Sequence, residues 1–259
     1  MTDSGGPRVV AMGDSVTFGV GDGAQWPDGM SGWAAHVATT LGASRFLNVA
    51  HNGVRARHLM ESQVPTVVAQ KPDIVLFTVG GNDVMRGDFS PDEISASLRR
   101  VFMKLDRPGT DVVTLTLDEI KIFRAFGGRV QRIMERRVAA TNNAIREACV
   151  GTGVHVLDGA EVFESVGPRA WHIDRIHPSQ DGHRALASRA VESLAARWRR
   201  VGEPTPARPS PGWAMRAGWL TVYGAPFVIK RSMDFVPQLA EVFRSEMRAE
   251  RVRAVAETT

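Results

Sequence analysis

Five short apolar segments alternate with segments of helical periodicity over the first 200 residues, and this alternation constrains the fold more than any other feature. Apolar runs bounded by turn residues are typical of buried strands, and strands separated by helices assemble into parallel sheets. The strand segments are residues 8–12, 45–50, 74–79, 111–117 and 153–158. The sequence therefore predicts an α/β protein on a doubly wound, five-stranded parallel sheet.

The segments between these strands carry helix signals. Ser31 offers an N-cap for one helix, and Ser90 precedes a first-turn proline and two early carboxylates in another. For the connector 118–128, with its apolar residues, packing is favoured over a role as a lid. The expected helices are 31–41, 57–70, 90–105, 129–150 and a last one that begins at Ser179 or Asp181 and runs to residue 200.

Composition excludes several classes of protein. The formal net charge of the 259 residues is only +4, and residues from Arg197 onward carry a net +5, which leaves the rest about neutral, so no nucleic-acid partner is expected. Cys149 is the single cysteine, which excludes an intramolecular disulfide and a zinc site built from cysteines. The start of the sequence has no signal-peptide pattern and no segment is typical of a membrane span, so a cytoplasmic location is expected.

Polar side chains gather in the loops that follow the predicted strands. Ser15 ends the first strand in Gly-Asp-Ser, Gly53 follows the second, Asn82 follows the third, and Asp174 and His177 come after the fifth. Parallel strands present their carboxyl ends along one edge, so these residues are expected to meet there. Gly-Asp-Ser alone is also a common turn sequence. Only its occurrence together with the other polar residues at strand ends favours a functional site.

Serine hydrolysis requires the kinds of residue found in these loops. It needs a nucleophile, a base that takes its proton, a carboxylate that orients the base, and donors for the developing oxyanion. Asp174 and His177 are three residues apart, so on one tight turn the carboxylate can bind one imidazole nitrogen and leave the other facing Ser15. The glycine-rich segment 16–23 lacks a phosphate-binding or dinucleotide fingerprint, and no cofactor is expected.

Four ordered motifs resemble those of the SGNH (GDSL-type) serine hydrolase and esterase family, over roughly residues 8 to 200. The resemblance implies a flavodoxin-like three-layer α/β/α sandwich. The matching segments are Gly13-Asp14-Ser15, Asn48-Val49-Ala50-His51-Asn52-Gly53, Gly80-Gly81-Asn82-Asp83 and Asp174-Arg175-Ile176-His177-Pro178.

The resemblance also implies a role for each matched residue. Ser15 would be the nucleophile, His177 the base and Asp174 the acid that orients it. The backbone N–H groups of Ser15 and Gly53, with the Asn82 side chain, would form the oxyanion hole. Activity should then rise with pH as the imidazole loses its proton.

Several other residues have competing interpretations. His51, Asn52 and Trp171 are candidates for the wall of a substrate pocket; Asn52 stands where the family more often has a small residue. Asp14 and Asp83 are expected to stabilise their own turns. Packing is favoured for Trp26 and Trp33, and a buried structural thiol for Cys149. His172, His177 and His183 lack a recognisable zinc spacing, so no metal is expected.

The sequence divides into a hydrolase domain of residues 1–202, a proline-rich linker of 203–212 and a mostly helical, amphipathic C-terminal extension of 213–259. Residues 234–255 are expected to form a basic amphipathic helix. Packing on the domain or formation of a homodimer through the extension is favoured over peripheral contact with a membrane.

The expected function is that of a serine esterase or acyl hydrolase, acting on a small-molecule ester with a small or lipid-like acyl group through an acyl-enzyme. An acyltransferase would use the same intermediate, with an alcohol in place of water. A binding protein that has kept the fold and lost catalysis is a third alternative, disfavoured because every motif residue is present.

Overall fold

The structure is a computed structural model that describes residues 5–23, 31–203 and 241–244. The chain divides into two compact units, the first formed by 1–84 with 90–206 and the second by 85–89 with 207–259. Of the second unit, the structure describes residues 85–89 and a helical turn at 241–244. The predicted linker lies outside the described residues except for residue 203, and the predicted extension except for 241–244. Their division and their proposed contacts therefore remain predictions.

A five-stranded parallel sheet in the order β2-β1-β3-β4-β5 forms the centre of the first unit. This order is the flavodoxin-like one, in which the chain reverses its winding direction beside β1. The strands are β1 (Arg8–Gly13), β2 (Arg45–Asn48), β3 (Ile74–Thr78), β4 (Asp111–Leu115) and β5 (His155–Leu157). The α/β class and the five predicted strands are confirmed.

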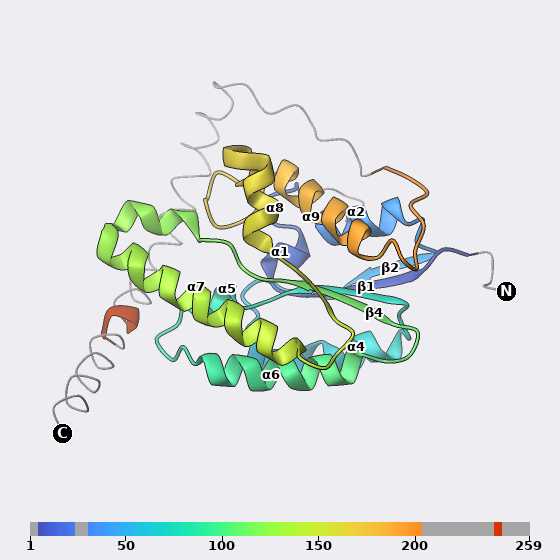
Figure 1. The fold of residues 1–259 in the computed structure, drawn as a ribbon, viewed down its shortest axis with the longest axis horizontal. Helices are drawn as coiled ribbons and strands as arrows, with labels where there is room; N and C mark the ends of the chain where they lie inside the picture. The colour runs from blue at the N-terminus through green and yellow to red at the C-terminus, as the bar shows by residue number, and fades with distance from the viewer. Residues whose placement is uncertain (1–4, 24–30, 204–240, 245–259) are drawn as a thin grey trace. The chain divides into compact units, whose positions relative to one another are not determined.

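Helices cover both faces of the sheet and complete three layers (Figure 1). Helices α2 (Trp33–Thr40), α8 (Gly159–Val166) and α9 (Gln180–Ser193) lie on one face, and α4 (Val64–Ala69), α6 (Pro91–Leu105) and α7 (Gly128–Cys149) on the other. The shorter elements are α1 (Ser15–Phe18), η1 (Ala56–His58), α3 (Leu59–Ser62), α5 (Gly81–Val84), η2 (Lys121–Phe126) and η3 (Gly167–Ala170).

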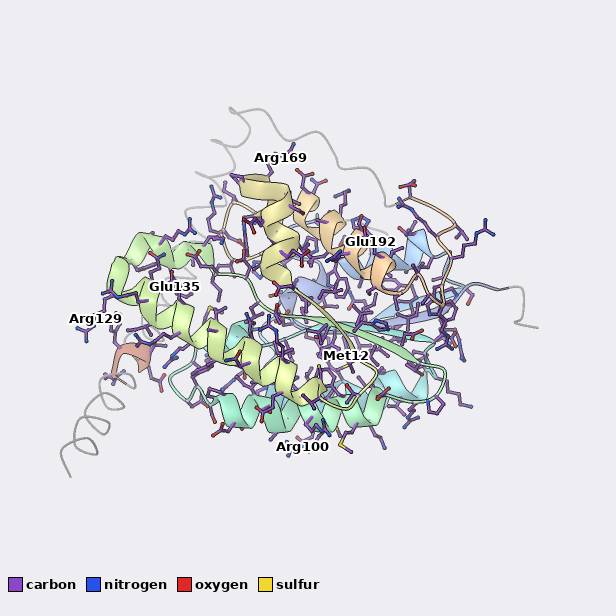
Figure 2. The ribbon with its side chains drawn as sticks, in the orientation of Figure 1. Met12, Arg100, Arg129, Glu135, Arg169 and Glu192 are labelled. Carbon is purple, nitrogen blue, oxygen red and sulfur yellow. The ribbon has the colours of Figure 1, made fainter. Side chains whose placement is uncertain are left out.

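The three inner strands, β1, β3 and β4, are mostly apolar and buried, as expected where both faces of a sheet are covered. All five residues of β3 are buried, and Met12 of β1 lies inside the molecule with side chains above and below it (Figure 2). On the face of the sheet that α6 covers, the ring of Phe77 of β3 is 5.5 Å from that of Phe102 of α6. Burial of such side chains supplies most of the driving force for this fold.

Two predicted helices differ from the structure at their boundaries. The predicted helix 57–70 is divided into η1, α3 and α4. Pro65, which lacks the N–H that a continuous helix would use, accounts for the break between α3 and α4. Ser31 is not the N-cap of α2: Gly32 occupies that position without a side-chain hydrogen bond. Ser90 does cap α6, with its hydroxyl accepting from the Glu93 N–H.

The remaining differences lie near the carboxyl edge. Residues 80–83, predicted as a loop, include the first three residues of the short helix α5. Helix α8 and η3 were not predicted; they separate β5 from the segment that holds Asp174 and His177, which therefore does not follow the strand directly. Ser179 caps α9, as one of two predicted alternatives, but the helix ends at Ser193 and not at residue 200.

In the connector 118–128, Ile120 and Phe123 are buried, and η2 is a short 3₁₀ helix. Within the described residues, no helix is long and apolar enough to span a membrane.

Candidate active site

Ser15 stands at the first position of α1, two residues beyond Gly13, the last residue of strand β1. The chain turns sharply there, and Gly13 makes the turn possible. Gly13 has φ +115°, and a Cβ atom at this position would lie 2.1 Å from the Thr78 carbonyl oxygen of β3. Any side chain at position 13 would therefore push β1 and β3 apart just before Ser15.

Gln63 holds the same glycine from the other side. Its carboxamide oxygen accepts from the Gly13 N–H at 2.5 Å, and its nitrogen donates to the Gly13 carbonyl at 3.0 Å. Strand β2 ends at Asn48, and the buried Gln63 side chain supplies the acceptor for the Gly13 N–H beyond that point. Gln63 sits at the break between α3 and α4, which lets its side chain point into the sheet edge.

Asp14 is the N-cap of α1, and its side chain bonds to the start of that helix and to β3. Its Oδ1 accepts from the Val16 N–H at 3.0 Å and from the Thr78 hydroxyl at 2.8 Å. The Thr78 hydroxyl is in turn 2.9 Å from that of Thr17. Burial raises the pKa of Asp14 to about 6, although the hydrogen bonds from Thr78 and Val16 act in the opposite direction.

Asp174 and His177 share one tight turn, as their spacing predicts. Asp174 Oδ1 accepts from the backbone N–H groups of Ile176 at 2.9 Å and His177 at 3.0 Å. Arg175 takes up the left-handed region at φ +56°, which is uncommon for a residue with a side chain. Its carbonyl accepts from the Ile122 N–H of η2 at 3.2 Å, so the connector supports this turn.

Three side chains from distant parts of the sequence form one hydrogen-bonded chain. His177 Nδ1 is 2.7 Å from Asp174 Oδ2, and His177 Nε2 is 2.8 Å from Ser15 Oγ. A carboxylate only accepts, so Nδ1 carries the proton and Nε2 is free to accept from the Ser15 hydroxyl. The arrangement can therefore transfer the Ser15 proton to His177.

Asp174 is charged in this arrangement. Burial acts to raise its pKa, but the close approach of His172 and the hydrogen bond from His177 outweigh burial and hold the pKa well below its usual value. His172 Nδ1 is 3.3 Å from the same oxygen, Oδ2, that binds His177. An ionised Asp174 favours the imidazolium that forms when His177 accepts a proton.

The loops of Gly53 and Asn82 are joined to each other beside Ser15. The backbone after β2 continues along β1, where the His51 N–H donates to the Gly13 carbonyl at 3.1 Å. Asn82 Nδ2 donates to the Val54 carbonyl at 3.0 Å, one residue beyond Gly53. This bond uses one of the two amide hydrogens of Asn82 and leaves the second for another acceptor.

Asp83 joins the two loops and is buried. Its Oδ2 accepts from the Ala56 N–H at 3.1 Å, and its Oδ1 binds Arg55 Nε at 3.2 Å. Burial raises the pKa of Asp83, and the Ala56 N–H and Arg55 reduce that effect. Asp83 was expected to stabilise its own loop, but these hydrogen bonds go to the segment that follows Gly53.

The candidate pocket residues lie in different surroundings. His51 and Asn52 are exposed beside Gly53. Trp171 is half-buried, with its ring 5.0 Å from that of Phe163 and Lys121 5.6 Å above it. The assignment of these residues to a substrate pocket stays a prediction.

Two tryptophans singled out in the sequence are not part of the hydrogen-bonded group at Ser15. Trp33 is fully buried in the core. Trp26 lies outside the described residues. Within the described part of the chain, no group of three or more histidine, cysteine, aspartate and glutamate side chains is arranged to hold a metal ion.

Sequence reasoning missed Gln63, Arg55 and helix α8. Helix α8 had a detectable signal, because Asp158 caps it through the Ala160 and Glu161 N–H groups, a pattern typical of a helix start. Gln63 and Arg55 had no comparable signal, since a lone glutamine or arginine between helical residues is usually solvated.

Comparison with known proteins gives a consistent result. Residues 11–185 match the GDSL-like lipase/acylhydrolase family model. An acetylxylan esterase of Geobacillus stearothermophilus is 26% identical over 219 residues, covering 74% of this chain and 96% of that protein.

Solved structures of Axe2, an acetylxylan esterase from Geobacillus stearothermophilus, are also similar. One catalytic mutant with a histidine changed to alanine superposes with a TM-score of 0.60 at 25% identity, covering 78% of this chain and all of that one. Further catalytic mutants of Axe2 carry a serine or an aspartate changed to alanine. LAE5, an α/β hydrolase from the metagenome of Lake Arreo in Spain, shares the fold with a TM-score of 0.58 at 22% identity, over 74% of this chain and 97% of that one.

Proposed function

The chain belongs to the GDSL-like lipase/acylhydrolase family and is a carboxylic ester hydrolase, and we propose that it acts through an acyl-enzyme on Ser15. The observation that carries this proposal is the unbroken hydrogen-bonded chain from Ser15 through His177 to Asp174. The Axe2 catalytic mutants replace the same three residue types, which supports the assignment.

Acylation begins when Ser15 Oγ attacks the ester carbonyl carbon and its proton passes to His177 Nε2. The negative charge moves to the carbonyl oxygen, where the Ser15 and Gly53 N–H groups and the second amide hydrogen of Asn82 would stabilise it. Collapse of this intermediate breaks the bond to the alcohol oxygen, and His177 donates its proton to that oxygen. The alcohol leaves, and the acyl group stays on Ser15.

Deacylation repeats the sequence with water. His177 removes a proton from a water molecule, whose oxygen attacks the acyl carbon. The second tetrahedral intermediate releases the carboxylic acid and returns the proton to Ser15 Oγ. Throughout both steps Asp174 stays ionised and holds the imidazole in one orientation.

The similarity to an acetylxylan esterase favours an acetyl ester of a sugar hydroxyl as the first class of substrate to examine. A series of aryl esters from acetate to octanoate would report the acyl preference, and acetylated xylose would report the alcohol preference. A rate that falls steeply with acyl length would support a small acyl pocket. A preference for octanoate would favour a lipid-like substrate instead.

The decisive test of the mechanism compares Ser15→Ala with the wild type on an aryl acetate. We expect kcat to fall on the order of 10⁴-fold or more, because the covalent route is lost. Ser193→Ala is a matched control, since the Ser193 hydroxyl only bonds to the Ala190 carbonyl on α9. If Ser15→Ala retained most of the activity, the proposed nucleophile would be wrong.

An acyltransferase would form the same acyl-enzyme and pass the acyl group to an alcohol. Adding a primary alcohol and measuring acid and new ester separately distinguishes the two outcomes. Hydrolysis predicts that acid remains the main product as alcohol is added.

A further inference from the structure

Two buried ionisable residues, His183 and Asp22, lie behind the candidate active site and have no part in the proposed chemistry. His183 is fully buried on α9, and Asp22 is buried in the segment that follows α1. Burying ionisable groups costs free energy unless hydrogen bonds compensate. The hydrogen-bond partners of His183 and Asp22 therefore indicate their role in the structure.

The partners of His183 fix both its tautomer and its orientation. Its Nδ1 is 3.2 Å from the Trp33 backbone nitrogen, which can only donate, so Nδ1 must accept. Its Nε2 therefore carries the proton and donates to the Val20 carbonyl at 2.9 Å. Burial lowers the pKa of His183 to about 4, which agrees with a neutral ring between these two partners.

Val20 connects His183 to the backbone of Ser15. The Val20 N–H donates to the Ser15 carbonyl at 3.0 Å, and the Val20 carbonyl accepts from His183. A single residue thus lies between the His183 ring and the peptide that carries the candidate nucleophile.

The same histidine is joined to the segment of His177 through the start of α9. The His183 N–H donates to the carbonyl of the N-cap Ser179 at 2.9 Å, two residues beyond His177. The two segments also meet directly. Gly21 has φ +102°, and a Cβ there would lie 1.9 Å from the Pro178 carbonyl oxygen, so the chain after α1 lies against the chain after His177.

Asp22 forms a second link across the same junction. Its Oδ1 pairs with Arg184 of α9 at 3.0 Å, and its Oδ2 accepts from the Gly32 N–H at 2.8 Å and lies 2.7 Å from His36 Nε2. These contacts fix the segment after α1 against α2 and α9 at a point next to His183.

We propose that His183 is a positioning residue for the Ser15–His177 pair, and that its Nε2–H···O=C bond to Val20 sets the distance between the nucleophile and its base. The inference rests on the proposed function, because it assigns no new reaction. It predicts that the Nε2 bond matters for turnover and the Nδ1 bond to Trp33 mainly for stability.

Two substitutions separate the two nitrogen atoms of the ring. In His183→Gln the carboxamide nitrogen reaches the position of Nε2 and can still donate to Val20. In His183→Asn the carboxamide reaches only the position of Nδ1, so it can accept from Trp33 and loses the bond to Val20. Leu98→Ala, in α6 on the other face of the sheet, is a control for lost stability alone.

The measurements are kcat and KM on an aryl acetate, the rate of inactivation by a fluorophosphonate, and the urea midpoint. We expect His183→Asn to lower kcat and the inactivation rate roughly tenfold to about 100-fold with KM nearly unchanged, since small misplacements of reacting groups have effects of this size. His183→Gln should stay within about threefold of the wild type, as should Leu98→Ala.

Equal kcat values for His183→Asn and His183→Gln would overturn the inference, as would a kcat loss that matches that of Leu98→Ala at equal loss of stability. The Ser15→Ala variant is assayed beside them. If it remained active, the proposed function would fail. If it were inactive while the two His183 variants turned over equally, only the positioning role would fail.

Discussion

Replacement of Asp14 by asparagine should stabilise the protein at neutral pH, although Asp14 caps a helix. The asparagine side chain would keep an oxygen at the position of Oδ1, the atom that accepts both hydrogen bonds of the native side chain, from Val16 and from Thr78. The change therefore removes the buried charge and leaves the local geometry intact. Because burial raises the pKa of Asp14, that charge opposes folding.

The magnitude follows from the pKa shift. The pKa rises from 3.8 to about 6 in the folded protein. Each unit corresponds to about 1.4 kcal/mol, so ionised Asp14 costs about 3 kcal/mol at neutral pH. As pH rises from 3.8, the unfolded chain loses this proton first while the folded chain keeps it until about pH 6. The contribution of Asp14 to stability therefore decreases across that window, and the asparagine variant lacks this decrease.

Urea unfolding of both proteins at a series of pH values between about 4 and about 7.5 measures the effect. The stability difference, asparagine variant minus wild type, should increase with pH by about 2 to 3 kcal/mol across the series. The other titrating groups are common to both proteins, so the contributions of those that do not interact with Asp14 cancel. A difference that is independent of pH, or that decreases as pH rises, would refute the reasoning about Asp14.

Three further predictions concern neighbouring groups. Asn82→Ala should lower kcat on an aryl acetate by ~10²–10³ without abolishing activity, because one oxyanion donor is lost; an unchanged kcat would exclude Asn82 from that role. Gln63→Leu should lower the urea unfolding free energy by about 1–3 kcal/mol, since the Gly13 N–H loses its partner, and an unaltered midpoint would contradict this. Cys149 should resist a thiol reagent at pH about 8 in the folded protein and react in urea, because burial raises its pKa to about 12; prompt labelling of the native protein would be inconsistent with that.

Much of the fold could be predicted because its signals are local. The alternation of strands and helices fixes a parallel sheet, and the carboxyl ends of its strands bring Ser15, Gly53 and Asn82 to one edge. The Asp174–His177 spacing likewise predicts the hydrogen bond that the structure contains. Each of these features depends on residues close in sequence or on the general geometry of parallel sheets.

The missed features depend on long-range contacts. Gln63 is 50 residues from Gly13, and its buried position results from a helix break at Pro65. Pro65 itself was a usable signal for that break. His183 has two backbone partners, Val20 and Trp33, each at least 150 residues away, so nothing in its own sequence surroundings predicts a buried neutral ring.

Covalent labelling tests whether Ser15 is the nucleophile that His177 activates. The folded protein is treated with a fluorophosphonate, and its mass and the modified peptide are determined by mass spectrometry. We predict one adduct, on Ser15, and no adduct on the Ser15→Ala variant. A wild-type protein that hydrolyses esters yet carries no label on Ser15, or carries it on another residue, would contradict the proposed mechanism.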